Sequence, residues 1–253
     1  MKTVNEKILD KKYFIFDIDG TLLDSMEMWS LADQMVIKNH LGIDVALDDL
    51  KAFRDGVLYN LQNLNGDIYM IFYDEIIKYF GLDMTAEEYS EERTGYSDYI
   101  SINSLDYKPG ADKLLQLLKE NDKKVAVATT TTRRQYDIYE HQNQNILKKA
   151  PFQKYVDIKV LCEDVEKKKP DPEAYLKVLK LFNCDAKDCI VFEDSLNGAI
   201  AAKEAGIEVV SIYDDSAKSE QDLLSKIVDY KIDSFEEFIE KSGLNKLQLI
   251  QKQ

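Results

Sequence analysis

Residues 13–22 read YFIFDIDGTL, an apolar run that stops at two aspartates one residue apart. The run Tyr13–Phe16 predicts a buried β-strand, and Asp17 and Asp19 follow at its carboxyl end. Side chains alternate between the two faces of a strand, but the loop after it can turn both acids toward one point. Gly20 permits that turn at no steric cost. An isolated Asp-x-Asp pair is more typical of a solvated loop than of a site, so its meaning depends on the other strands.

Four further apolar runs predict buried strands of a parallel sheet, at residues 125–128, 158–162, 189–192 and 209–213. Helical patterns lie between them, at residues 111–119, from Pro172 onward and at 197–205. An edge strand is expected at residues 230–232, followed by a helix from Ser234. Alternating strands and helices of this kind predict an α/β fold with a doubly wound, Rossmann-like parallel sheet.

The segment between the first two predicted strands is too long for a normal crossover and contains no convincing strand. Its patterns predict helices instead, at about residues 26–40, 69–80 and 86–100. We therefore expect two domains. Residues 1–25 and 105–253 form the α/β core, and residues 26–104 form an inserted helical domain.

The composition limits the classes of partner. The 253 residues include 33 Lys and Arg and 47 Asp and Glu, a formal net charge of −14. Such a surface repels nucleic acid and anionic membranes but still allows a small anionic substrate. The start of the chain is too polar for a secretory signal, no apolar run reaches about 18 residues, and the three cysteines are expected to be buried apolar filler. We expect a cytoplasmic protein, and a monomer.

Polar residues follow the predicted strands at the edge of the sheet where ligands collect in α/β folds. Asp17 and Asp19 follow the first strand, and the other positions are Thr129 and Thr130 after the second, Lys169 beyond the third, and Glu193 and Asp194 after the fourth. Asp214 and Asp215 follow the fifth strand and are expected to face solvent.

Several carboxylates would thus converge, and at about 4 Å with an effective dielectric near 20 each close pair costs roughly 4 kcal/mol. A cation must offset this repulsion. The candidate ligands Asp17, Asp19, Glu193 and Asp194 offer hard oxygens, and no histidine follows a predicted core strand, which favours Mg²⁺ over zinc. Lys169 supplies a second positive charge, so the set predicts a phosphoryl-binding site.

The chemistry expected from this set is phosphoryl transfer. Asp17, directly at the strand end, is the candidate nucleophile that forms an aspartyl-phosphate. Asp19 is the candidate acid and base, which protonates the leaving oxygen and later activates water. Taken singly, Lys169 is more typical of a solvated charge run and Glu193 with Asp194 can equally cap a helix. The inference depends on their order along successive strands.

Four motifs in this order resemble those of the haloacid dehalogenase superfamily of phosphohydrolases, in the branch with a helical cap after the first motif. The motifs are residues 17–22 (DIDGTL), 125–129 (VAVAT), 169–172 (KPDP) and 191–195 (VFEDS) with Gly198. The resemblance implies that Asp17 is nucleophile and metal ligand, that Asp19 is acid and base and gives its carbonyl to the metal, and that Asp194 with Glu193 completes the metal site. It also implies that Thr129 and Lys169 bind the transferring phosphoryl group, and we expect Thr130 to assist them.

Within that family the pattern is similar to sugar-phosphate phosphatases and to β-phosphoglucomutase. Those mutases often have valine where Thr21 stands and place a histidine where Trp29 stands. Their cap arginine has no clear counterpart, since Tyr59 lies nearest with Arg54 close by. These departures favour hydrolysis of a small phosphorylated metabolite. We expect substrate specificity to be set by cap residues that include Glu27, Trp29, Arg54, Tyr59 and Asn63.

Two other functions remain open at this point. A β-phosphoglucomutase-like enzyme would need a bisphosphate activator and would release little inorganic phosphate. A phosphorylated signalling domain or a non-catalytic binding protein is disfavoured, because here Thr129 precedes Lys169, a second acidic pair follows the fourth strand, and a large insertion separates the first two strands.

Overall fold

The computed structural model describes residues 4–61, 68–214, 221–242 and 244. Its centre is a six-stranded sheet of order β3-β2-β1-β4-β5-β6 in which every pairing is parallel. The strands are β1 (Tyr13–Phe16), β2 (Lys124–Ala128), β3 (Ile158–Val160), β4 (Cys189–Glu193), β5 (Glu208–Ile212) and β6 (Tyr230–Ile232). The predicted fold class, a doubly wound parallel sheet, is confirmed.

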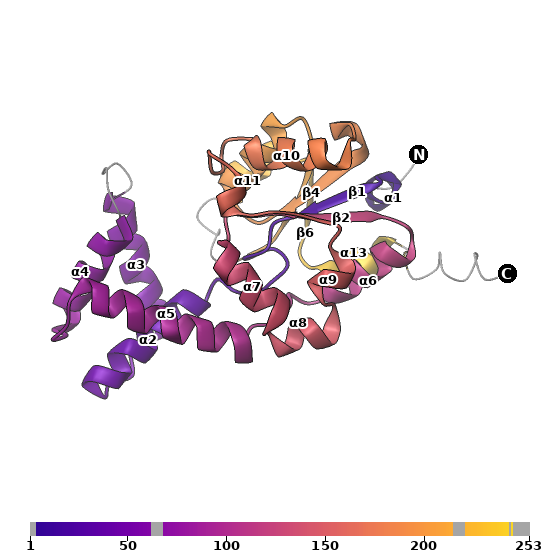
Figure 1. Ribbon diagram of the computed structural model, residues 1–253. Coiled ribbons are helices and arrows are strands. Elements are labelled where there is room, and N and C mark those ends of the chain that lie inside the picture. The colour runs from indigo at the N-terminus through magenta and orange to yellow at the C-terminus, as the bar shows by residue number, and fades with distance from the viewer. Residues whose placement is uncertain (1–3, 62–67, 215–220, 243, 245–253) are drawn as a thin grey trace. The chain divides into compact units, whose positions relative to one another are not determined.

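Helices cover both faces of the sheet because its strands are apolar on both sides. Figure 1 shows α10 and α11 on one face and α6, α9 and α13 on the other. One buried cluster includes Leu114, Tyr139 and Phe235, and the opposite cluster includes Tyr175, Ala199 and Leu224. The helices of this part are α1 (Val4–Asp10), α6 (Ala111–Glu120), α7 (Arg133–His141), α8 (Gln144–Lys149), α9 (Phe152–Tyr155), α10 (Glu173–Phe182), α11 (Leu196–Glu204), α12 (Gln221–Ile227) and α13 (Phe235–Ser242).

Three predicted strand ends needed correction, and in the fifth strand the change is only from residue 213 to Ile212. The third strand stops at Val160 instead of residue 162, because the Leu161 N–H donates to Asp164 Oδ2 (2.9 Å) and a short 3-10 helix, Cys162–Asp164, begins there. The fourth strand extends to Glu193, which is therefore its last residue and does not lie in the loop.

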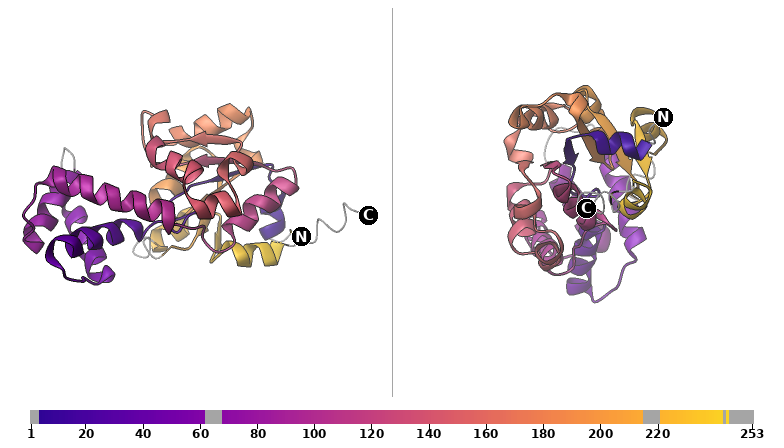
Figure 2. Two further views of the ribbon diagram at one scale, coloured as in Figure 1. Left: turned by 60° about the horizontal axis from the view of Figure 1, so that its bottom comes forward. Right: turned by 90° about the vertical axis from the view of Figure 1, so that its right-hand side faces the viewer.

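The segment between β1 and α6 is helical, as its patterns predict. It contains α2 (Met28–Leu41), α3 (Leu47–Leu61), α4 (Ile68–Phe80) and α5 (Ala86–Asn103), of which α3 was not predicted. Helix α2 packs against α5, and Val36, Phe72 and Tyr89 belong to one buried cluster. These helices can be followed in the further views of Figure 2.

Contacts divide the chain into two compact units. One unit contains the residues up to Met26 and those from Leu105 onward, which build the sheet and its helices. The other unit, Glu27–Ser104, contains the four helices α2 to α5. None of the helices that the structure describes is long and apolar enough to cross a membrane.

Candidate active site

The strand order places the predicted motifs side by side. Strand β1 lies between β2 and β4, with Phe16 paired to Val127 on one side and to Phe192 on the other. Asp17, Thr129 and Asp194 therefore leave the same edge of the sheet, where the carboxyl ends of parallel strands meet. The arrangement that was expected from the sequence rests on this central position of β1.

Lys169 joins two of the predicted acids. Its Nζ donates to Asp17 Oδ1 at 2.6 Å, to Glu193 Oε1 at 2.5 Å and to the Ala128 carbonyl at 2.9 Å. Its side chain is only 5% exposed. Burial alone would lower the pKa of Lys169, but the charges of Asp17 and Glu193 outweigh that effect and raise the pKa well above its usual value. The lysine is therefore a fixed positive charge beside Asp17.

Glu193 lies deeper than the sequence suggested, because it ends β4 and is fully buried. Besides Lys169, its carboxylate accepts hydrogen bonds from the Tyr175 hydroxyl (2.8 Å) and the Ser195 hydroxyl (3.0 Å). Tyr175 also stacks its ring below the lysine, with the Lys169 Nζ 5.1 Å from the ring centroid. Glu193 thus orients Lys169, and Tyr175 is a site residue that the motifs did not reveal.

The loop after β1 brings Asp194 close to the first motif. Thr21 donates its hydroxyl to Asp194 Oδ1 at 2.6 Å, and both residues are buried. Gly20 has a φ of +80°, and a Cβ there would lie 2.4 Å from Asp194 Oδ2. The glycine is therefore needed for the turn and for the close approach of the carboxylate.

Two of the carboxylates are held in an environment that disfavours their charge. Burial raises the pKa of Asp17 to about 7, with a further increase from Glu193 and an opposing effect of Lys169. Burial and the charges of Glu193 and Asp17 raise the pKa of Asp194 well above its usual range. Among the described side chains, the buried carboxylates of Asp17, Glu193 and Asp194 thus carry more negative charge than Lys169, the lysine beside them, can offset.

Asp19 is held by two hydroxyl groups that sequence reasoning did not identify. Thr131 donates to Asp19 Oδ2 at 2.5 Å, and Tyr139 donates to Oδ1 at 2.9 Å. Thr131 also contacts the predicted phosphoryl ligand Thr129, with 2.8 Å between the two hydroxyl oxygens. Thr131 lies within the threonine run that marks the second motif, whereas Tyr139 lies on α7, a helix that was not predicted.

The site is matched by a family model described as haloacid dehalogenase-like hydrolase over residues 11–206. The chain belongs to this family. The predicted resemblance and the predicted class of enzyme, a hydrolase of the haloacid dehalogenase type, are thereby confirmed.

Relatives of this hydrolase include named phosphatases. A Drosophila melanogaster protein described as a pseudouridine-5'-phosphatase is 26% identical over 90% of the chain and 96% of its own length. A phosphorylated carbohydrates phosphatase from Thermotoga maritima is 29% identical over 77% of the chain and 81% of its own length. Among solved structures, a Thermotoga maritima protein described as a beta-phosphoglucomutase superposes with a TM-score of 0.71 and 26% identity, covering 94% of this chain and 99% of that one.

The donor set of this hydrolase fits a magnesium ion by its chemistry. Asp17 and Asp194 offer buried carboxylate oxygens, and Asp19 offers a backbone carbonyl. Lys169, which pairs with both Asp17 and Glu193, offsets only part of the negative charge of these acids. Within the described residues, the predicted ligands do not bring three side-chain oxygens within 4.8 Å of one another. Such a trio occurs instead at Asp137, Glu140 and His141, where Lys159 already neutralises Glu140 at 2.6 Å.

Two expectations for the core were wrong. Asp214 does not face solvent, because it is buried and accepts a hydrogen bond from Lys108 at 2.5 Å; Asp215 lies outside the described residues. Of the three cysteines, only Cys189 is fully buried, whereas Cys162 and Cys184 are partly exposed.

Thr130, predicted to assist phosphoryl binding, is the second residue after β2 and is exposed.

Three of the residues predicted to set specificity contact other residues of the helical unit. Glu27 pairs with Lys51, and Arg54 Nη1 donates to the Ser30 hydroxyl at 3.2 Å. The guanidinium carbon of Arg93 lies 4.8 Å above the Trp29 ring. Tyr59 lies on α3. Asn63 is outside the described residues.

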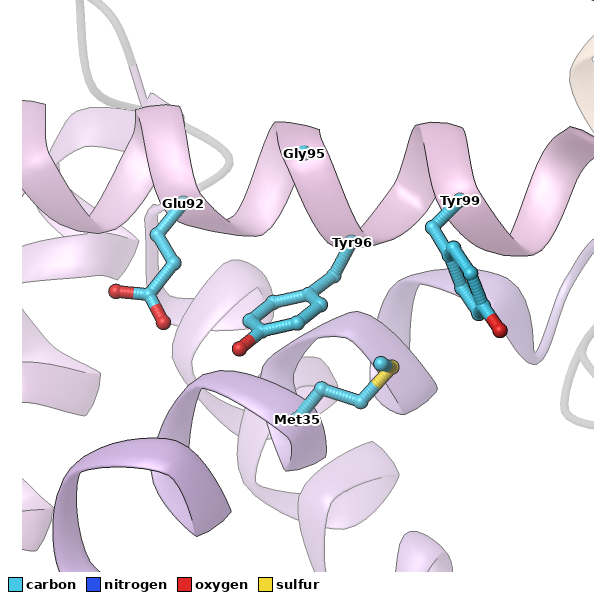
Figure 3. A pocket seen from close by; sticks show the side chains of 5 residues that line it. All are labelled: Met35, Glu92, Gly95, Tyr96 and Tyr99. Carbon is cyan, nitrogen blue, oxygen red and sulfur yellow. The ribbon is translucent and has the colours of Figure 1, made fainter.

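The helical unit also has an open groove of about 450 Å³ between α2 and α5, which is drawn in Figure 3. Its lining is formed by Met35, Glu92, Gly95, Tyr96 and Tyr99. Among the described residues, none of those predicted to take part in catalysis or specificity is part of this lining.

Proposed function

We propose that this hydrolase is a Mg²⁺-dependent phosphatase that acts on a small phosphorylated metabolite, such as a sugar phosphate. The observation that carries the proposal is the placement of a buried lysine between Asp17 and Glu193 at the edge where β1, β2 and β4 end. Relatives named as phosphatases of phosphorylated carbohydrates and of pseudouridine 5'-phosphate support this class of substrate.

In the proposed reaction a carboxylate oxygen of Asp17 attacks phosphorus. The bond to the leaving oxygen breaks, and Asp19 gives that oxygen its proton, so an alcohol departs and an aspartyl-phosphate remains. Asp19 then takes a proton from water as the water oxygen attacks phosphorus. This step releases inorganic phosphate and restores the Asp17 carboxylate.

The other residues serve to bind and orient. Lys169 and the Thr129 hydroxyl would contact the phosphoryl oxygens, because Lys169 donates to Asp17 and Thr129 follows β2, which pairs with β1. The Thr129 hydroxyl, which donates to Thr131 in this structure, would turn its proton to the phosphoryl group. Asp17, Asp194 and the Asp19 carbonyl would hold Mg²⁺, which supplies charge neutralisation for the phosphoryl group. Glu193 would keep Lys169 in place rather than bind the metal directly.

We further propose that the helical unit acts as a cap that selects the leaving group. Residues 27–104 are a compact unit inserted shortly after the first motif, and the motif residues lie in the other unit. Lids of this kind exclude water and choose among substrates.

The test is phosphate release from p-nitrophenyl phosphate and from a panel of sugar and nucleotide monophosphates, with Mg²⁺ or with EDTA. Wild type is compared with Asp17→Asn and with Asp24→Asn, the same change at an exposed aspartate of the same loop. We expect Mg²⁺-dependent release that is lost in Asp17→Asn and retained in Asp24→Asn. Release that is unaffected by Asp17→Asn or by EDTA would contradict the proposal.

A phosphosugar mutase is the second candidate, favoured by the structural match to a protein described as a beta-phosphoglucomutase. A mutase must bind a second phosphate, and Trp29, where the mutases place a histidine, instead stacks with Arg93. Conversion of glucose 1-phosphate that needs a bisphosphate activator, with little phosphate released, would favour this function over hydrolysis.

A further inference from the structure

Tyr139 is a buried tyrosine that no motif accounts for. It lies on α7, and its side chain is fully buried within the apolar cluster below the sheet. An apolar residue would suit that position, since a buried hydroxyl is costly unless it finds a partner. The partner of this hydroxyl is Asp19 Oδ1, at 2.9 Å.

The phenol is fixed as a donor toward Asp19. Its hydroxyl has one proton, which it donates to Asp19 Oδ1. The Gln135 side chain, one helical turn earlier, hydrogen-bonds the same phenol. A residue of the same helix thus holds the tyrosine in place, and the phenol cannot turn away from Asp19 without breaking a buried hydrogen bond.

The opposite oxygen of Asp19 faces the phosphoryl-binding side. Thr131 gives its one hydroxyl proton to Asp19 Oδ2, so the 2.8 Å contact between the threonine hydroxyls must be a donation from Thr129 to Thr131. A chain of hydroxyl groups therefore leads from Thr129 to Oδ2. Each oxygen of the Asp19 carboxyl therefore accepts one hydroxyl hydrogen bond, Oδ1 from Tyr139 and Oδ2 from Thr131, and Oδ2 lies on the side of Thr129.

We propose that Tyr139 is a positioning residue that holds the carboxyl of Asp19, the proposed acid and base, in one orientation, with Oδ1 toward α7 and Oδ2 on the side of Thr129. This inference rests on the proposed phosphatase function. Without the phenol, Asp19 retains Thr131 but can rotate about its side-chain bonds, and the fraction of time in the productive orientation falls.

The experiment compares Tyr139→Phe with Tyr136→Phe. Both tyrosines lie on α7 and are fully buried, but the Tyr136 hydroxyl faces Glu140 (3.4 Å) instead of the site. Each variant is assayed on p-nitrophenyl phosphate, whose nitrophenolate leaves as a stable anion, and on the best sugar phosphate of the panel, whose alkoxide needs a proton. The quantity compared is kcat/KM, which covers the steps up to departure of the leaving group.

We expect Tyr139→Phe to lower kcat/KM on the sugar phosphate on the order of tenfold, as part of the 10²–10⁴ that general acid catalysis contributes, and to leave p-nitrophenyl phosphate within about twofold. Tyr136→Phe should leave kcat/KM on both substrates within about twofold of wild type. It should lower Tm about as much as Tyr139→Phe does. An equal loss on both substrates, or no loss on either, would overturn the inference. A wild type that releases no phosphate from any compound would overturn the proposed function, and this inference with it.

Discussion

Gly198 shows how closely single residues constrain the site. It lies in the first turn of α11, and an added Cβ would lie 1.9 Å from Glu193 Oε1. The Glu193 carboxylate, which holds Lys169, would have to move. Gly95 is also a helical glycine, on α5, but apart from the adjoining residues of its own helix no described atom lies within 4 Å of the place a Cβ would take.

We predict that these two glycines respond in opposite ways to substitution by alanine. Gly198→Ala should lower the free energy of unfolding by about 1–3 kcal/mol through overpacking, and should lower kcat because Lys169 loses its support. Gly95→Ala should raise the free energy of unfolding by about 0.5–1 kcal/mol, because alanine restricts the unfolded chain and favours a helix. Urea unfolding measures both, and a neutral Gly198→Ala would refute the packing argument.

The pKa of Asp17 predicts a pH-dependent stability. This carboxyl ionises near 3.8 in the unfolded chain and, mainly because of burial, at about 7 in the folded protein. The folded protein therefore binds the extra proton between these values, and the stability due to this group is complete below about pH 4 and lost as the pH rises through 7. At about 1.4 kcal/mol per pKa unit the loss amounts to a few kcal/mol.

Urea unfolding of the metal-free protein in EDTA, at several pH values between 4 and 8, measures this effect. The free energy of unfolding of wild type should fall across the range relative to that of Asp17→Asn, which has no proton to lose. Parallel curves for the two proteins would show that the Asp17 carboxyl is not protonated in the folded state near neutral pH.

At the scale of elements, α5 begins at a well-formed N-terminal cap. The Thr85 hydroxyl accepts from the Glu88 N–H (3.2 Å), and the Thr85 N–H donates to Glu88 Oε2 (2.8 Å). This reciprocal pair explains why an 18-residue helix with a polar composition starts at Ala86. The capping sequence could be read directly from the chain, and the predicted start of this helix was correct.

We predict that Thr85→Ala lowers the free energy of unfolding by about 1 kcal/mol, because one end of α5 loses its cap. Thr85→Ser keeps the hydroxyl oxygen and should cost much less. Thermal unfolding of both variants tests the cap, and equal destabilisation by alanine and serine would assign the effect to the lost methyl group.

Helix α7 is the element whose absence from the sequence prediction mattered most. It follows four consecutive threonines and begins with two arginines, and its buried face consists mostly of polar or tyrosine side chains such as Gln135, Tyr136 and Tyr139. Tyrosine carries no clear apolar signal, so the periodicity was weak. The Tyr139 contact with Asp19 was missed for the same reason.

For the whole molecule, the division into two units predicts that chemistry and specificity can be separated. The proposed catalytic residues lie in the unit with the sheet, and Trp29 and Arg54 lie in the helical unit. We predict that Trp29→Ala or Arg54→Ala changes the order of preference among sugar and nucleotide monophosphates, while p-nitrophenyl phosphate is still hydrolysed. Kinetics on the substrate panel measure this, and an equal loss on every substrate would refute it.

The monomeric state and the cytoplasmic location stay predictions.

The sequence by itself determined the parallel sheet, the insertion and the motif residues, because apolar runs, breaks in pattern and the spacing of charged residues are local properties of the chain. The tertiary structure decided which groups meet. The position of β1 between β2 and β4 brings Lys169 to Asp17, residues 152 positions apart, and buries Glu193 beneath both. Such contacts depend on strand order and on which helix covers which face, and no local pattern specifies either. The hydrogen bonds from Tyr139 to Asp19 and from Lys108 to Asp214 are contacts of this kind.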